Sequence, residues 1–419
     1  MTQGLFQRFE GVYILDGLRT PVVDYMGAFA DANPIDLGIA AARAVLEHAQ
    51  MPATQVDSVL AGNMAPGGFD QFYVPRHIGL YAGVPIQVPA LMVQRICGTG
   101  FELFRQAAEQ MVTGGASTAL LVGTESMTRN PIAAFDHRGG FRLGAPVAFK
   151  DYMWEALNDP AAVSMIMTAE NLAKQYGITR AEVDAFAARS FERALAAQES
   201  GWLAGEIAPV EEAVFELAGY KARRLKLAGK HKRADRDTHP RPTTVEVLSG
   251  LRTVFPDGVQ TGGNSSALTD AAAAAVMARA DAAQAWQQRT GRSPLGRVAA
   301  AAVVGVPPEV MGIGPAPAID RLLKGVGLAM DDVARFEINE AQGAQTLAVS
   351  RALNLPLDRL NVHGGAIALG HPLAATGVRL TVTVARQLQA IGARWGVASA
   401  CIGGGQGIAL LIENPGAST

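Results

Sequence analysis

Short apolar runs of strand length alternate along the chain with segments in which apolar residues recur every three or four positions. The runs that predict strands cover 12–15, 58–61, 119–122, 297–304, 336–338, 396–400 and 407–412. The helical periodicity covers 36–49, 101–112, 316–326, 341–353 and 377–391. Because strands and helices alternate in both halves of the chain, the pattern predicts an α/β protein with two similar halves.

The middle of the chain differs, because it contains helical periodicity at 168–176 and 179–197 but few strand-like runs. Thr179 with Glu182 three residues later is typical of a capped helix start. We interpret this region as an insertion. The predicted units are an N-terminal half at 1–127 completed by about 265–288, an inserted loop domain at 128–264, and a C-terminal half at 289–419.

Composition excludes several classes of protein. With 419 residues, 49% hydrophobic and 18% charged, the chain can bury a large core. A net charge of −2 gives no electrostatic footprint for nucleic acid. No apolar run reaches the roughly 18 residues of a membrane span, so we expect no membrane partner. The first ten residues lack an apolar signal core, which predicts a cytoplasmic location.

A basic segment lies within the predicted insertion. Residues 221–241 carry nine Lys or Arg, interrupted by Asp235 and Asp237. Such a segment is typical of a solvated loop, and it could equally be the seat of a phosphorylated ligand. Nucleic acid is the weaker third interpretation.

The chain has only two cysteines, and each lies among glycines. Glycines let backbone N–H groups approach a reacting atom, and a thiolate is a strong nucleophile. Cys97 follows a strand-like run at 90–93 and precedes a helix that begins near Phe101, where the helix dipole would lower its pKa. The alternative is a small buried hydrophobe, the usual state of a free cysteine. Isolated cysteines and seven histidines without HExxH spacing predict no metal site.

Four motifs together resemble the thiolase family, in the same order and with similar spacing. They are Cys97-Gly-Thr-Gly100, Asn339-Glu-Ala-Gln342, the run Gly-Gly-Ala-Ile-Ala-Leu-Gly-His-Pro that ends at Pro372, and Cys401-Ile-Gly-Gly-Gly405. The chain resembles a thiolase from end to end. The resemblance implies a five-layered αβαβα fold of two similar halves. It also implies that the inserted loop domain binds CoA, with the basic segment toward the CoA phosphates.

The resemblance also implies a mechanism for the cleavage of 3-ketoacyl-CoA or the reverse Claisen condensation. Cys97 would form an acyl-enzyme with His371 as its base, and Cys401 would be the general acid/base at the α-carbon of the second acyl-CoA. His371 and a water held by Asn339 would form one oxyanion hole. The backbone N–H groups of Cys97 and Gly403 would form the other.

Two departures from the family lie beside the expected substrate channel. Gln342 replaces an aromatic residue near the pantetheine, and Ser164-Met165-Ile166 replaces the usual His-Met-Gly. Ser266 matches a serine that contacts the pantetheine. His363 is interpreted as a packing residue. The departures predict that 3-ketoacyl-CoAs longer than acetoacetyl-CoA are cleaved at least as efficiently.

The resemblance leaves other functions open. A dedicated condensing enzyme for an unusual acyl group is one, and a non-catalytic acyl-CoA-binding subunit is another. CoA and acyl-CoA would be substrates, so we expect no cofactor. Family members are usually homodimers or homotetramers, which implies the same here.

Overall fold

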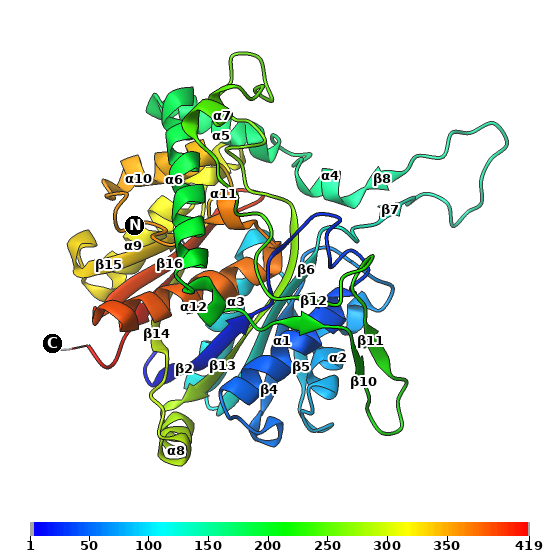
Figure 1. Ribbon diagram of the computed structural model, residues 1–419, viewed down its shortest axis with the longest axis vertical. Coiled ribbons are helices and arrows are strands. Elements are labelled where there is room, and N and C mark those ends of the chain that lie inside the picture. Colours follow the sequence, from blue (N-terminus) through cyan, green and yellow to red (C-terminus); the bar gives the residue numbers. More distant parts are fainter. Residues whose placement is uncertain (1–3, 418–419) are drawn as a thin grey trace.

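A computed structural model describes residues 4–417 of the protein (Figure 1). Its main sheet runs in the order β15-β16-β17-β14-β2-β13-β6-β4-β5. The N-terminal part of this sheet contains β2 (Val12–Arg19), β13 (Thr269–Arg279), β6 (Thr118–Ser126), β4 (Ser58–Gly62) and β5 (Ala90–Val93). The C-terminal part contains β14 (Gly296–Gly305), β17 (Gln406–Glu413), β16 (Trp395–Ile402) and β15 (Val333–Ile338). The short strands β1 (Leu5–Arg8) and β3 (Val23–Asp24) pair with β14 and β13.

The two parts of the sheet have the same topology. In each part the first strand, β2 or β14, pairs antiparallel with the last strand, β13 or β17. That last strand pairs antiparallel with β6 or β16, which in turn pairs parallel with β4 or β15. The two parts are joined into one sheet where Ile14 and Tyr13 of β2 pair with Gly296 and Arg297 of β14. The predicted similarity of the two halves is therefore confirmed at the level of the strands.

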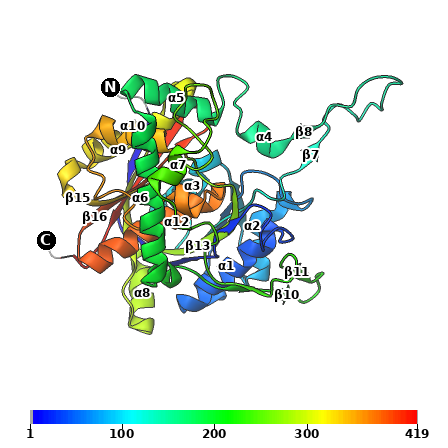
Figure 2. The ribbon, with the colours of Figure 1, turned by 45° about the horizontal axis from the view of Figure 1, so that its top comes forward.

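Helices form the other three layers (Figures 1 and 2). The central layer consists of α3 (Thr99–Val112) and α12 (Leu373–Ile391), which share one hydrophobic cluster with inward side chains of both sheet parts. The outer faces are covered by α1 (Pro34–His48) and α2 (Val74–Tyr81) on one side, and by α9 (Pro315–Val326) and α10 (Gly343–Leu353) on the other. The predicted αβαβα order is thus confirmed.

Two glycines allow the central helices to touch. A Cβ atom on Gly100 of α3 would lie 2.5 Å from the Val378 nitrogen, and one on Gly377 of α12 would lie 2.3 Å from the Phe101 nitrogen. Because no side chain fits at either position, the close approach of α3 and α12 requires glycine. Helix α3 begins two residues after Cys97, and α12 begins two residues after His371. The contact between the helices therefore brings these two residues toward each other.

The chain between β6 and β13 crosses the top of the molecule and then runs along the N-terminal sheet. It contains β7 (Ile132–Ala133), β8 (Lys150–Asp151), α4 (Tyr152–Ala156), α5 (Met165–Tyr176), α6 (Arg180–Glu199), the pairs β9–β12 (Val210–Glu211 with Arg233–Ala234) and β10–β11 (Ala213–Phe215 with Arg223–Leu225), and α7 (Val245–Ser249). The loop between β7 and β8 projects away from the body in both views (Figures 1 and 2). The predicted capping box of Thr179 and Glu182 is present at the start of α6.

Most predicted elements are confirmed within a few residues of their ends, but β13 was missed. Its sequence, Thr-Asp-Ala-Ala-Ala-Ala-Ala-Val-Met-Ala-Arg, is rich in alanine, which is uncommon in strands. The strand is buried on both faces between α1 and α12, where small side chains allow close packing.

The remaining helices are α8 (Ala280–Thr290) and α11 (Ala366–Leu369). The predicted domain boundaries stay predictions.

Within residues 4–417, no helix combines the length and the apolar character needed to cross a membrane. The same residues contain no group of three or more His, Cys, Asp or Glu side chains that could hold a metal ion.

Candidate active site

Two adjoining cavities open between the inserted region and the C-terminal half. The outer cavity has a volume of about 950 Å³, and the inner one has a volume of about 60 Å³. The inner cavity is lined by Cys97, His371 and Cys401. Residues that line both cavities form the neck between them: Met127, Leu157, Met165, Ser266, Gln342, His371 and Leu373. A long, narrow ligand could therefore enter through the outer cavity and reach both cysteines.

Cys97 lies in a short 3₁₀ helix, Ile96–Gly98, directly before α3. The preceding residue, Ile96, has a φ of 46°, a strained backbone conformation for a β-branched residue. The thiol is buried, and the backbone N–H groups of Gly403 and of Cys97 itself hydrogen-bond to it. Burial dominates and raises the pKa of the Cys97 thiol to about 11. The prediction of a lowered pKa is therefore wrong, because desolvation outweighs the two N–H groups.

His371 lies in the bend between α11 and α12. Its Nδ1 is 2.7 Å from the Thr376 Oγ1, and its Nε2 is 3.3 Å from the Asn339 Nδ2. Because an amide nitrogen can only donate, this geometry makes Nε2 the acceptor and leaves the ring proton on Nδ1. Burial, with a smaller contribution from Arg379, lowers the pKa of His371 to about 3. The imidazole is therefore neutral and has a lone pair on the nitrogen that faces Asn339.

Cys401 and Asn339 complete the set of predicted reactive residues. Cys401 is fully buried at the end of β16, and burial together with Cys97 raises the pKa of its thiol well above the usual range. Asn339 follows β15, and its backbone N–H donates to the Ser399 oxygen at 2.9 Å. Its Oδ1 is buried without a hydrogen-bond partner. Asn339 does not line either cavity, but its side chain contacts His371, which lines both.

The predicted substrate-binding residues divide between the two cavities. Ser266, Met165 and Gln342 line the neck, as a contact with a pantetheine chain would require. Ser164 lines only the outer cavity, and its Oγ caps α5 by accepting from the Met167 N–H at 3.2 Å. The side chain of Ser164 therefore has a structural partner and does not face the reactive cysteines.

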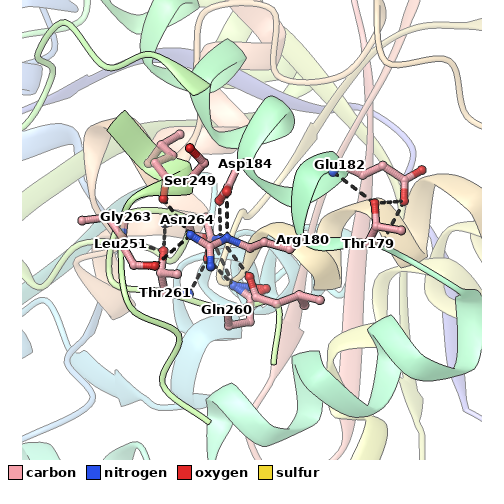
Figure 3. A network of polar contacts seen from close by, with 12 residues as sticks. Thr179, Arg180, Glu182, Asp184, Ser249, Leu251, Gln260, Thr261, Gly263 and Asn264 are labelled. Carbon is pink, nitrogen blue, oxygen red and sulfur yellow. Dashed lines mark hydrogen bonds and ion pairs between the residues drawn. The ribbon is translucent and has the colours of Figure 1, made fainter. Parts of the chain in front are cut away.

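A buried polar network fixes the cavity wall that carries Ser266 (Figure 3). Asn264 donates to Asp184 of α6 at 2.9 Å and accepts from the Gln260 amide at 2.8 Å. The side-chain oxygen of Gln260 in turn accepts from the backbone N–H of Ala344, at the start of α10, at 2.9 Å. This network links α6, the segment 260–264 and the first turn of α10, which follows directly after Gln342.

Part of the basic segment packs on the N-terminal half, and its position toward the CoA phosphates stays a prediction. Arg223 forms ion pairs with Asp36 and Asp70 at 2.6 and 2.7 Å, which fasten β11 to the N-terminal half. Of residues 221–241, only His239 lines the outer cavity. His363 also lies away from both cavities and stacks on Trp202, with ring centroids 4.1 Å apart, in agreement with a packing role.

Several residues that line the inner cavity were not predicted from the sequence. Three methionines, Met64, Met153 and Met311, lie on its wall, as does Gln345 of α10. Gln345 follows Gln342 by three residues, so helical spacing from the Asn-Glu-Ala-Gln motif was the available signal. Glu125, fully buried, accepts from the Met64 N–H at 3.0 Å and the Ala374 N–H at 3.1 Å. It thereby ties the Met64 loop to the start of α12.

Comparisons with known proteins agree with this geometry. The family model of the thiolase N-terminal domain matches residues 12–281, and that of the thiolase C-terminal domain matches residues 292–414. The mitochondrial 3-ketoacyl-CoA thiolase of Bos taurus is 40% identical over 97% of this chain and 98% of its own. An acetyl-CoA acetyltransferase of Pseudomonas aeruginosa is 38% identical over 96% of this chain and 99% of its own.

A solved structure gives the same result. Human mitochondrial 3-ketoacyl-CoA thiolase in complex with CoA superimposes with a TM-score of 0.89 at 39% identity, covering 96% of this chain and 98% of that one. The chain therefore belongs to the thiolase family.

Proposed function

We propose that this thiolase catalyses the CoA-dependent cleavage of 3-ketoacyl-CoA, or the reverse Claisen condensation, through an acyl-enzyme on Cys97. The observation that carries the proposal is the shared inner cavity of Cys97, His371 and Cys401. The relatives named above are 3-ketoacyl-CoA thiolase and acetyl-CoA acetyltransferase, and both names agree with this chemistry. CoA and acyl-CoA enter as substrates.

In the first half-reaction of cleavage, the Cys97 sulfur attacks the 3-keto carbon while its proton passes to His371 Nε2. The backbone N–H groups of Cys97 and Gly403, which contact the sulfur, can donate to the developing oxyanion. The bond between C2 and C3 then breaks, and Cys401 supplies the proton that converts the C2 carbanion into acetyl-CoA. His371 and a water on Asn339 stabilise the thioester oxygen during that step.

In the second half-reaction, the thiol of free CoA attacks the acyl group on Cys97. The Cys401 thiolate left by the first half-reaction takes the proton of the CoA thiol, the carbon–sulfur bond to Cys97 breaks to release a shortened acyl-CoA, and His371 returns its proton to the Cys97 sulfur. His371 suits this role because it is neutral before the reaction and can hold the Cys97 proton between the two half-reactions.

The test is a thiolysis assay with acetoacetyl-CoA and CoA, combined with alkylation of Cys97 by iodoacetamide. We expect turnover, and we expect acyl-CoA to protect Cys97 from alkylation. A folded protein that binds acyl-CoA without turnover would instead be a non-catalytic acyl-CoA-binding subunit. A protein that only condenses would be a dedicated condensing enzyme.

For the assembly we propose a homodimer or homotetramer. Phe69, Phe72 and Tyr73 are exposed, and Phe69 and Phe72 line a hollow together with Met92 of β5, the strand at the edge of the sheet. Exposed aromatic side chains beside a free strand edge suit a contact between copies of the chain. A cytoplasmic location stays a proposal.

A further inference from the structure

The inner cavity contains two amide side chains among apolar ones. Five methionines line it: Met64, Met127, Met153, Met165 and Met311. Gln342 lies at the neck, whereas Gln345 lines only the inner cavity, beside Thr168 and Gly312. Gln345 therefore lies beyond the neck, beside Cys97 and Cys401, where the acyl group would lie if the pantetheine occupies the neck.

Gln345 has an unused hydrogen-bond donor. Its Oε1 accepts from the Gln342 N–H at 3.4 Å, and because an N–H can only donate, this contact fixes the orientation of the amide. Its Nε2 is buried without a partner, and the whole residue is only 1% exposed. A buried donor without a partner is costly, so such groups usually meet an acceptor from water or a ligand.

The Gln345 side chain is also held in place. A Cβ atom on Gly312 would lie 2.6 Å from the Gln345 Cγ, so Gly312 packs closely against it. The preceding residue, Ala344, is bonded to the buried network of Gln260 and Asn264 in Figure 3. The amide therefore cannot readily turn toward another protein partner.

The charges around the inner cavity limit the kind of acceptor. Among the residues that line it there is no Lys or Arg, and His371 is neutral. Glu125 acts on Cys97 in the direction that raises the pKa of its thiol, so it adds no positive charge to the site. A carboxylate on the acyl chain would be buried without a counter-ion, which is unfavourable. A neutral oxygen has no such cost.

We propose that Gln345 selects 3-ketoacyl-CoAs whose acyl chain carries an uncharged hydrogen-bond acceptor, such as an ether oxygen, over purely aliphatic or carboxylated ones. This inference rests on the proposed thiolase function and specifies its substrate class. Gln345 is a specificity-determining residue and takes no part in proton transfer.

The test compares three substrates in thiolysis. They are 3-ketohexanoyl-CoA, its analogue with an ether oxygen in place of the C5 methylene, and 3-ketoadipyl-CoA, whose chain ends in a carboxylate. We expect kcat/KM to be about 3- to 10-fold higher for the ether than for 3-ketohexanoyl-CoA, the effect of one neutral hydrogen bond. We expect the carboxylate to be the poorest of the three.

The variant Gln345→Met keeps the volume of the side chain but removes the donor. It should abolish the preference for the ether over 3-ketohexanoyl-CoA. Because the ether oxygen also makes the ketone more electrophilic, the informative quantity is the change in preference between variant and wild type. Gln389→Met is the matched control, since Gln389 donates to the Pro294 oxygen outside both cavities.

Other outcomes overturn the inference. Equal losses on all substrates would mean that Gln345 holds a water in the reacting centre, and an unchanged preference would mean that it does not contact the acyl group. If Gln345→Met does not fold, Gln345→Asn withdraws the donor by one methylene and serves the same test. Wild-type thiolysis without an ether preference rejects this inference alone, whereas absence of any thiolysis rejects the proposed function as well.

Discussion

At the scale of single residues, the two buried cysteines are distinguished by what surrounds them. Cys97 has two backbone N–H groups on its sulfur, whereas Cys401 is fully buried and its pKa is raised by burial and by Cys97. This difference suits one thiol to nucleophilic attack on a carbonyl and the other to proton transfer. The Cys-Gly motifs identified both positions, but sequence could not predict the pKa of Cys97, which depends on the packing of distant segments around it.

The variant Cys401→Ala should separate the two half-reactions. We expect it to accept an acyl group on Cys97 while its overall turnover falls by roughly 10²- to 10⁴-fold, the usual contribution of a general acid/base. Intact mass and steady-state thiolysis measure the two quantities. Loss of acylation in parallel with turnover, in a folded variant, would contradict the division of roles between the cysteines.

His371 and Asn339 should differ in importance. His371→Ala removes both a base and an oxyanion donor, and one such donor alone contributes about 3 to 4 kcal/mol to transition-state stabilisation. Asn339→Ala should be milder, because its proposed contact with substrate passes through water. Comparing kcat/KM for acetoacetyl-CoA in the two variants is the measurement. A larger loss in Asn339→Ala would refute the water-mediated role.

The pKa of Cys97 predicts how alkylation depends on pH in the absence of substrate. A thiol with a pKa of about 11 stays protonated at neutral pH, so its thiolate fraction rises roughly tenfold per pH unit until the pH approaches that value. The rate of iodoacetamide reaction at Cys97, followed by peptide mass, should rise accordingly between pH 7 and 10. A rate that is already constant from neutral pH would show that the Cys97 thiol is ionised without substrate.

At the scale of elements, the strongly periodic helices and the β-branched strands were predictable, but β13 was not. An alanine run has no period that separates strand from helix, and only the close layers on either side of β13 make small residues favourable there. The ion pairs of Arg223 with Asp36 and Asp70 could not be predicted either, because these residues lie far apart in the sequence. Gln345 was missed because its unused donor becomes visible only when its neighbours are known.

The network around Asn264 should stabilise the wall of the neck. Asn264→Ala removes bonds to Asp184, Gln260 and the Thr261 N–H, and it leaves buried groups without partners. We expect the free energy of unfolding to fall by about 1 to 3 kcal/mol for an unsatisfied buried group, together with a higher KM for CoA. Thermal unfolding and steady-state kinetics measure the two effects.

Asn171→Ala serves as its control, because the Asn171 amide donates to the Glu309 oxygen near the surface, outside the buried network. The control should lose less stability and keep the KM for CoA. Equal effects of the two variants would argue against a special role of the network.

At the scale of the whole molecule, the five layers bring the two halves together at the contact of α3 and α12. That contact places the motif of Cys97, from the first half, beside those of His371 and Cys401, from the second. The motifs therefore predicted that Cys97, His371 and Cys401 lie together. The size of the inner cavity could not be predicted, because it depends also on side chains of the inserted region.

A series of substrates with acyl chains of different length tests whether the inner cavity can enlarge. The inner cavity is small, about 60 Å³, but five flexible methionines line it, and such side chains can rearrange to admit a longer acyl group. Each added methylene could contribute about 0.8 kcal/mol if room is made. We predict that substrates longer than acetoacetyl-CoA are cleaved at least as efficiently. A steep optimum of kcat/KM at four carbons, in a series up to twelve, would refute this.

The most direct test of the proposed mechanism is the covalent intermediate. Purified protein is incubated with acetyl-CoA without a second substrate, and its intact mass and peptides are then measured. We predict one acetyl group, located on the peptide that contains Cys97, and none on a folded Cys97→Ala variant. An acetyl group elsewhere that supports turnover in Cys97→Ala would place the nucleophile on another residue and contradict the mechanism.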